Sequence, residues 1–215
     1  MMEIMLEEVV GALEKNNFQA HVAHNNDEVL DLIVDIVERE NPKTIALGSS
    51  QSLKTVGAYN LLKNSPGIHC IDTVEIIKGL MENPKDAALV KQIHMAMTSE
   101  MFLCGTNAII SNGQLVNIDM AGNRVAFLAF GPPRVIVVAG KNKIVPDFKS
   151  AVARIKLGAA PMNAKRLKVD TPCVQTGKCS NCNSPQRICC NWLITEKCLP
   201  KNRITVILVD ENLGF

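Results

Sequence analysis

Two continuous runs of apolar, mostly β-branched residues constrain the fold of this chain more than any other feature. They cover residues 134–139, between Pro133 and Gly140, and residues 203–209 near the end of the sequence. A strand that is apolar at nearly every position is buried on both faces, and such strands occur in parallel sheets that helices cover on both sides. The sequence therefore predicts an α/β fold.

The order of elements along the chain agrees with this fold class. An apolar strand at 44–47 precedes a small-residue loop and a helix at about 53–63, which is the opening of a strand–helix unit. The Asn112-Gly113 pair joins two apolar segments and indicates a hairpin, so we expect antiparallel strands to be mixed into the sheet. We also predict a strand near 68–71 and helices at about 2–16, 27–40, 84–99 and 147–157.

Length and composition indicate a protein of the cytoplasm with one domain over residues 1–215. No apolar run approaches the roughly 20 residues that span a bilayer, and the first 13 residues lack the features of a signal peptide. Residues 1–140 hold 10 basic and 16 acidic side chains, whereas residues 141–203 hold 13 and 3. The basic segment could bind nucleic acid or an anionic substrate, or offset thiolate charge, but one Trp and one Tyr argue against stacking on bases.

Six of the eight cysteines lie between residues 173 and 198, within a predicted cysteine-rich insertion at about 161–202 that precedes the last strand. Cys179 and Cys182 form a C-x₂-C pair, whose spacing lets two thiolates of one turn bind one metal ion. Cys173 and Cys189 flank this pair at six and seven residues. These four residues predict an S₄ site for Zn²⁺ or an iron–sulfur cluster.

Other interpretations of the cysteines stay open at this stage. A disulfide-linked subdomain would need an oxidising compartment, and redox-active thiols need no metal. Cys190 could replace Cys189 as a ligand, and Cys198 could replace one of the four or serve a cluster. Cys70 and Cys104 stand in apolar surroundings and are expected to be small core residues.

Polar and small residues at the ends of predicted strands are candidates for a ligand site. Gly48, Ser49 and Ser50 lie between a strand and a helix, where backbone N–H groups and hydroxyls can hold a phosphate or carboxylate. Further groups of this kind are Gly105-Thr106-Asn107, Gly122-Asn123-Arg124 and Asn142-Lys143. Glu100 is the carboxylate of this region that could act as a general base. Each group could also serve only as a turn.

Several strings resemble the LUD family of lactate-utilisation domains, and in particular a single-domain subgroup with a C-terminal cysteine cluster. They are residues 46–50, 104–109, 119–124, 140–147 and the cysteine stretch 171–189. The resemblance implies an open Rossmann-like mixed sheet flanked by helices, of the NagB/RpiA/CoA-transferase-like type, with a cleft at the strand ends. It also implies a cleft formed by Gly48, Ser49, Ser50, Thr106, Asn107, Asn123 and Lys143.

Three functions follow as expectations. The first is a redox-associated accessory protein or oxidoreductase component for lactate or a related organic acid, which binds a small anionic metabolite and holds an iron–sulfur or zinc centre. The resemblance implies partner redox proteins for it, and a homo-oligomer stays open. The second is a CoA- or sugar-phosphate-dependent transferase or isomerase, with Glu100 and Lys143 at the reacting centre and a structural zinc. The third is a metabolite-sensing regulator.

Overall fold

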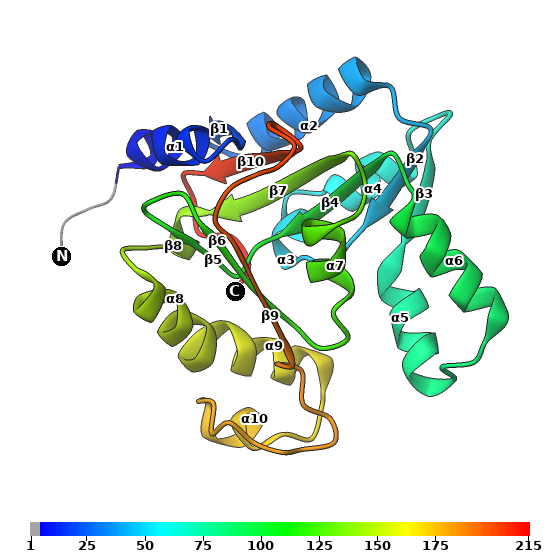
Figure 1. Ribbon diagram of the computed structural model, residues 1–215, viewed down its shortest axis with the longest axis vertical. Helices are drawn as coiled ribbons and strands as arrows, with labels where there is room; N and C mark the ends of the chain where they lie inside the picture. The colour runs from blue at the N-terminus through cyan, green and yellow to red at the C-terminus, as the bar shows by residue number, and fades with distance from the viewer. Residues whose placement is uncertain (1–4) are drawn as a thin grey trace.

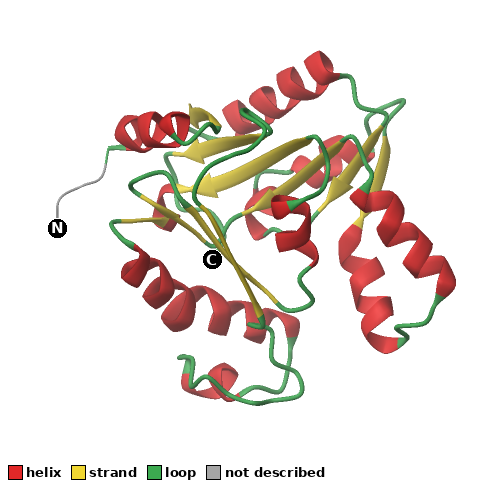
Figure 2. Ribbon diagram, viewed as in Figure 1, coloured by secondary structure: helices red, strands yellow, loops and turns green. Residues whose placement is uncertain are grey.

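A computed structural model describes residues 5–215 and confirms the predicted fold class (Figure 1; Figure 2). Six parallel strands form the main sheet in the order β1-β10-β7-β4-β2-β3. Their bounds are Gln19–Ala23 (β1), Thr44–Leu47 (β2), His69–Asp72 (β3), Met101–Gly105 (β4), Arg134–Gly140 (β7) and Ile204–Val209 (β10). The carboxyl ends of all six strands therefore share one edge of the sheet.

The alternation of side chains along the central strands divides the core into two halves. In β7, Val135 and Val137 face one core cluster, whereas Ile136 and Val138 face the other. The first half is covered by α1 (Leu6–Lys15), α5 (Thr73–Glu82), α6 (Ala87–Met97) and α7 (Asn123–Ala129). The second is covered by α2 (Asn26–Glu40), α3 (Gln51–Thr55) and α4 (Ala58–Lys63). Both runs that dominate the sequence are thus strands buried on both faces, as predicted.

The predicted hairpin exists, but it belongs to a second sheet and not to the main one. Strands β8 (Ile144–Val145), β5 (Ala108–Ile110), β6 (Leu115–Asp119) and β9 (Asn191–Thr195) form this sheet in that order. Ile109 and Leu115 face the main core, while Ala108, Ile110 and Val116 face the opposite side. Because both faces of the hairpin are apolar, it forms a separate layer between the main sheet and the helices beneath it.

One long helical segment covers the outer face of the second sheet (Figure 1). It comprises α8 (Phe148–Arg154), a π-helical turn at Ile155–Ala159 and α9 (Ala160–Leu167). The helix predicted at 147–157 thus continues to Leu167. Pro161 is tolerated because it follows the π-helical turn, where the regular hydrogen-bond ladder is already interrupted.

Residues 161–202, predicted as an insertion, contain more regular structure than an excursion from the sheet would need. They begin inside α9, and then form α10 (Pro172–Thr176), a cysteine-rich loop at 177–190 and strand β9. Strand β9 pairs with β6 from Leu115↔Thr195 to Asp119↔Asn191, so the chain returns to the second sheet before it enters β10.

The sequence patterns did not predict several elements, and they predicted one helix where the structure has two. Strand β1, helix α5 and helix α7 were not predicted, and the helix predicted at about 53–63 is divided into α3 and α4 at Gly57, whose φ is +80°. Asn25 caps α2, since its side chain accepts a hydrogen bond from the Glu28 N–H. Within residues 5–215, no helix is both long enough and apolar enough to cross a membrane.

Candidate functional site

A cleft of about 500 Å³ lies at the carboxyl-terminal edge of the main sheet. Its walls come from the loops after β2, β4 and β6, from α5, and from α9 on the opposite side. This is where open α/β sheets generally bind ligands, because the loops that follow parallel strands gather there. Of the seven residues that were expected in a ligand site, six line the cleft: Ser49, Ser50, Thr106, Asn107, Asn123 and Lys143.

Gly48 lies behind the cleft and has a packing role. Its N–H donates to the Leu103 carbonyl at 2.8 Å, and a Cβ at this position would lie 2.7 Å from the Phe102 ring. A side chain there would therefore collide with the core. The prediction that Gly48 contacts a ligand is therefore corrected. This position needs glycine because only a residue without a Cβ fits against Phe102.

The turn after β2 is less open to an anion than the sequence indicated. The Ser50 N–H donates to the Tyr59 hydroxyl at 3.2 Å, and the Ser50 hydroxyl accepts the Leu53 N–H at 3.2 Å as the cap of α3. The Tyr59 hydroxyl in turn donates to the Gly48 carbonyl, and burial raises the pKa of Tyr59 to about 12. Ser49 is the exposed residue of this turn, and its hydroxyl lies 3.4 Å from Arg166 Nη2.

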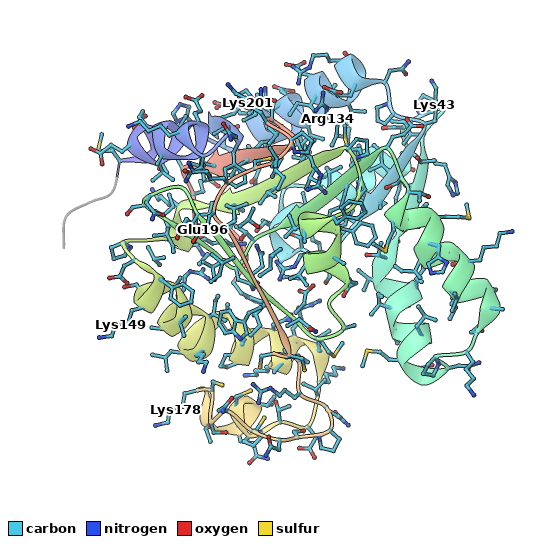
Figure 3. The ribbon with its side chains drawn as sticks, in the orientation of Figure 1. Lys43, Arg134, Lys149, Lys178, Glu196 and Lys201 are labelled. Carbon is cyan, nitrogen blue, oxygen red and sulfur yellow. The ribbon has the colours of Figure 1, made fainter. Side chains whose placement is uncertain are left out.

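Glu100 lies at the opposite edge of the main sheet from the cleft. It precedes β4, and its Oε2 accepts the Lys43 N–H at 2.7 Å. It lines a different hollow, together with Arg134. Figure 3 shows Lys43 and Arg134 at the end of the molecule opposite Lys149 and Lys178. The expected pairing of Glu100 with Lys143 is therefore corrected, and the transferase or isomerase alternative loses its general base.

Arg124 organises the floor of the cleft, a role that the sequence did not reveal. It is 9% exposed and forms an ion pair with Asp119 at 2.9 Å. Its guanidinium donates six hydrogen bonds to acceptors around β4 and β6, which are Asp119 Oδ1 (twice), Asn117 Oδ1, Asn107 Oδ1 and the Gly105 and Ile118 carbonyls. This network joins the two sheets. Asn107 consequently lines the cleft with a side-chain oxygen already bonded to the protein.

Lys143 is a buried amine that opens onto the cleft. Its residue is 4% exposed, and Nζ donates to the Ser52 hydroxyl at 2.9 Å. The pKa of Lys143 is lowered to about 7, chiefly by burial and also by the nearby Arg154 and Arg124 guanidinium groups, while Cys104 acts in the opposite direction. A substantial fraction of this amine is therefore neutral near pH 7, unlike an ordinary lysine.

Two cations that line the cleft have no acidic partner in the described part of the chain. Asp119 is paired with Arg124, and Glu75 with Lys78 at 4.0 Å. Within residues 5–215, neither Lys143 nor Arg166 has a carboxylate within ion-pair distance. Arg166 instead donates to Asn163 Oδ1 and to the Ser49 hydroxyl. The cleft thus presents positive charge. Arg166 was not predicted as a site residue, because it is one of many basic residues in segment 141–203 and no motif distinguishes it.

The four cysteines predicted as ligands gather around one loop. Burial raises the pKa of Cys189, and so do the thiols of Cys179, Cys173 and Cys182, whereas Arg187 lowers it. Arg187 also binds the loop together, since it donates to the Cys182 carbonyl at 2.6 Å and to the Cys189 carbonyl at 2.9 Å. In the described part of the chain, no three or more His, Cys, Asp or Glu side chains are arranged to hold a metal ion. The donors are therefore neighbours without a common centre.

Two sulfur atoms of this cluster already have polar neighbours. The Asn181 N–H donates to Cys179 Sγ at 3.4 Å, and the Thr171 hydroxyl lies 3.2 Å from Cys173 Sγ. Cys198 belongs elsewhere, because it packs in the core near α1 and its Sγ accepts the Ile204 N–H at 3.3 Å. Cys198 thus lies apart from the loop and is not available as an alternative ligand. Cys104 is a core residue, and burial raises its pKa to about 12.

The cysteine cluster and the cleft share a wall. Cys173, Ala164 and Ile188 form a small core. Val169 and Cys189 pack against this core. Ile188 and Val169 also line the cleft.

Comparison with known proteins gives the family. The sequence matches the family model of the LUD domain over residues 6–209, which is nearly its whole length. The chain belongs to the LUD domain family. Among solved structures, a DUF162 family protein from Deinococcus radiodurans is similar at 13% sequence identity, with a TM-score of 0.31, over 87% of this LUD chain and 99% of that one. A search of curated proteins finds no match.

Proposed function

We propose that this LUD protein binds a small organic acid in the cleft at the strand ends and takes part in the utilisation of lactate or a related acid. The observation that carries the proposal is the charge of the cleft, where Lys143 and Arg166 lack acidic partners within the described residues. A bound carboxylate would supply the missing negative charge. Membership of the LUD family supports an acid of this class.

Arg166 is the residue that we propose to bind the carboxylate. Its guanidinium is exposed, lines the cleft and already points a nitrogen toward the Ser49 hydroxyl. Arginine and a hydroxyl together offer a carboxylate charge-assisted hydrogen bonds, which contribute about 1.5–3 kcal/mol each. The cleft volume of about 500 Å³ is within the range of small-molecule sites and exceeds what lactate alone would fill.

Calorimetric titration of the full chain with lactate, pyruvate and inorganic phosphate tests this proposal. We expect saturable binding of a carboxylate, weakened at least about tenfold in Arg166→Met because one charge-assisted contact is lost. Lys149→Met is the matched control, since Lys149 is exposed on α8 outside the cleft (Figure 3). Absence of saturable binding of either acid, or an equal loss in both variants, would contradict the proposal.

We propose further that Cys173, Cys179, Cys182 and Cys189 hold a zinc ion or an iron–sulfur cluster. The chemistry of four neighbouring thiols fits either group, and the Asn181 N–H already donates a hydrogen bond to Cys179 Sγ. Binding would require the sulfur atoms to move onto a common centre. A zinc would stabilise the loop, whereas a cluster could also exchange electrons with a partner protein.

Metal analysis after anaerobic purification tests the cysteine site. We expect bound zinc or iron, lost in Cys179→Ser together with part of the thermal stability. Cys70→Ser is the matched control, because Cys70 lies in β3 of the main sheet and not in the cysteine-rich loop. Metal-free protein with reduced thiols, or equal metal loss in both variants, would refute the assignment.

A further inference from the structure

Among residues 5–215, the amine of Lys143 has no carboxylate partner of the kind that a buried lysine usually has. It is 4% exposed, yet its hydrogen bond goes to the neutral hydroxyl of Ser52, a residue with no exposed surface. Buried lysines are ordinarily paired with a carboxylate, because an unpaired ammonium loses its hydration without compensation. Asp119, the acidic residue of the cleft floor, is already bonded to Arg124.

Positive neighbours make the neutral amine still more favourable. Arg124 and Arg154 both act on Lys143, and both are fixed by hydrogen bonds to the backbone around the cleft. Arg154 donates to the Asn107 carbonyl at 2.6 Å and to the Asn142 carbonyl at 2.9 Å. Desolvation together with a neighbouring cation is the arrangement that activates a lysine as a nucleophile toward carbonyl groups.

We propose that Lys143 forms an imine with the carbonyl carbon of a 2-oxo acid bound in the cleft. This inference rests on the proposed function, since it uses the cleft as a site for small organic acids. It specifies the ligand as one with a ketone beside its carboxylate, which lactate lacks. Arg166 and Ser49 would bind the carboxylate while the ketone faces Nζ, because both groups line the same cleft.

The step balances without any further reactant. The lone pair of Nζ attacks the carbonyl carbon, and one amine proton moves to the carbonyl oxygen to give a carbinolamine. The nitrogen then expels this oxygen as water, which carries away the second amine proton, and a C=N bond replaces the C=O bond. One water is released for each imine, and nothing is oxidised or reduced. The neutral imine suits the site because Arg124 and Arg154 disfavour a further positive charge.

Reductive trapping on the full chain tests the proposal, with pyruvate as the probe. Pyruvate and sodium borohydride should give a single adduct whose mass equals the oxo acid less one oxygen atom, and peptide mapping should place it on Lys143. Lactate with borohydride should give no adduct. Lys143→Arg should abolish the adduct, and Lys141→Arg should retain it, because Lys141 is an exposed neighbour paired with Asp210 at 3.0 Å.

The outcomes separate this inference from the proposal on which it rests. An adduct confined to Lys143 in the unaltered chain supports it, even if Lys143→Arg fails to fold. Saturable binding of pyruvate without any adduct overturns the imine and leaves the organic-acid site intact. Adducts spread over exposed lysines overturn it as well. No binding of either acid in the calorimetric titration, together with no adduct, overturns both.

Discussion

The buried amine of Lys143 makes a specific prediction for the pH dependence of stability. Its pKa is lowered to about 7 in the folded protein, whereas an unfolded lysine keeps its ordinary value of 10.5. Between these two values the unfolded chain binds more protons than the folded chain. Stability therefore rises with pH in this window, and the contribution of the amine is most unfavourable below about pH 7, where both states are protonated.

The size of the effect follows from the number of protons taken up on unfolding. From about pH 7 to about pH 9 this number grows from about one half to nearly one, because the folded amine loses its proton while the unfolded amine keeps it. One proton changes the free energy of unfolding by about 1.36 kcal/mol per pH unit, so the gain over this interval is about 2 kcal/mol. Lys143→Met removes the titrating group and should not show this gain.

Urea unfolding monitored by circular dichroism at the two pH values measures the difference. We expect the free energy of unfolding of the unaltered chain to rise by about 2 kcal/mol more than that of Lys143→Met. Lys149→Met is the control, because it makes the same substitution at an exposed position on α8. Parallel pH profiles for the unaltered chain and Lys143→Met would refute the neutral amine, and with it the chemical basis of the imine.

Two further substitutions test the cleft floor and the hairpin. Arg124→Met leaves the Asp119 carboxylate, whose side chain is 11% exposed, without its ion-pair partner and should lower the free energy of unfolding in urea by about 3 kcal/mol. Arg134→Met removes a half-exposed pair and should cost under about 1 kcal/mol; equal losses would contradict the role of Arg124. In Gly113→Ala, the new residue must keep φ near +85°, and its Cβ would lie 2.5 Å from the Ala12 backbone. Thermal unfolding should therefore show a loss of about 2 kcal/mol in the free energy of unfolding. Gly177→Ala also keeps a positive φ, of +71°, but its Cβ would meet open space, so it should lower the free energy of unfolding by about 1 kcal/mol. A smaller loss for Gly113→Ala than for Gly177→Ala would contradict the packing of Gly113 against Ala12.

Much of the fold could be predicted because burial on both faces leaves a strong pattern. Strands β2, β7 and β10 are apolar at most positions, and the Asn112-Gly113 turn fixed the hairpin. Strand β1 was not predicted because its polar residues weaken the apolar pattern. In the sheet formed by residues 5–215 it is an edge strand, paired with β10. The separate second sheet could not be predicted, since the hairpin pattern does not say which layer the strands join.

The cleft could be predicted in part for a geometric reason. Residues that follow parallel strands meet at one edge, so Ser49, Thr106 and Lys143 were placed together correctly. The same rule applied to Glu100 would have put it at the other edge, because it precedes β4. Arg166 reaches the cleft only because the helix runs through the π-helical turn as far as Leu167, which the sequence pattern did not show.

The shared wall between the cysteine cluster and the cleft links the two proposed sites physically. Ile188 is flanked by Arg187, which binds the loop together, and by Cys189, one of the four candidate ligands. Drawing the sulfur atoms onto a metal would therefore act next to a residue that lines the cleft. Because coupling between two binding sites is reciprocal, any change that metal loading made in the affinity for the acid would equal the change that the acid made in the affinity for the metal. The position of Ile188, more than the cysteine count, is thus the reason to treat the loop as part of the site.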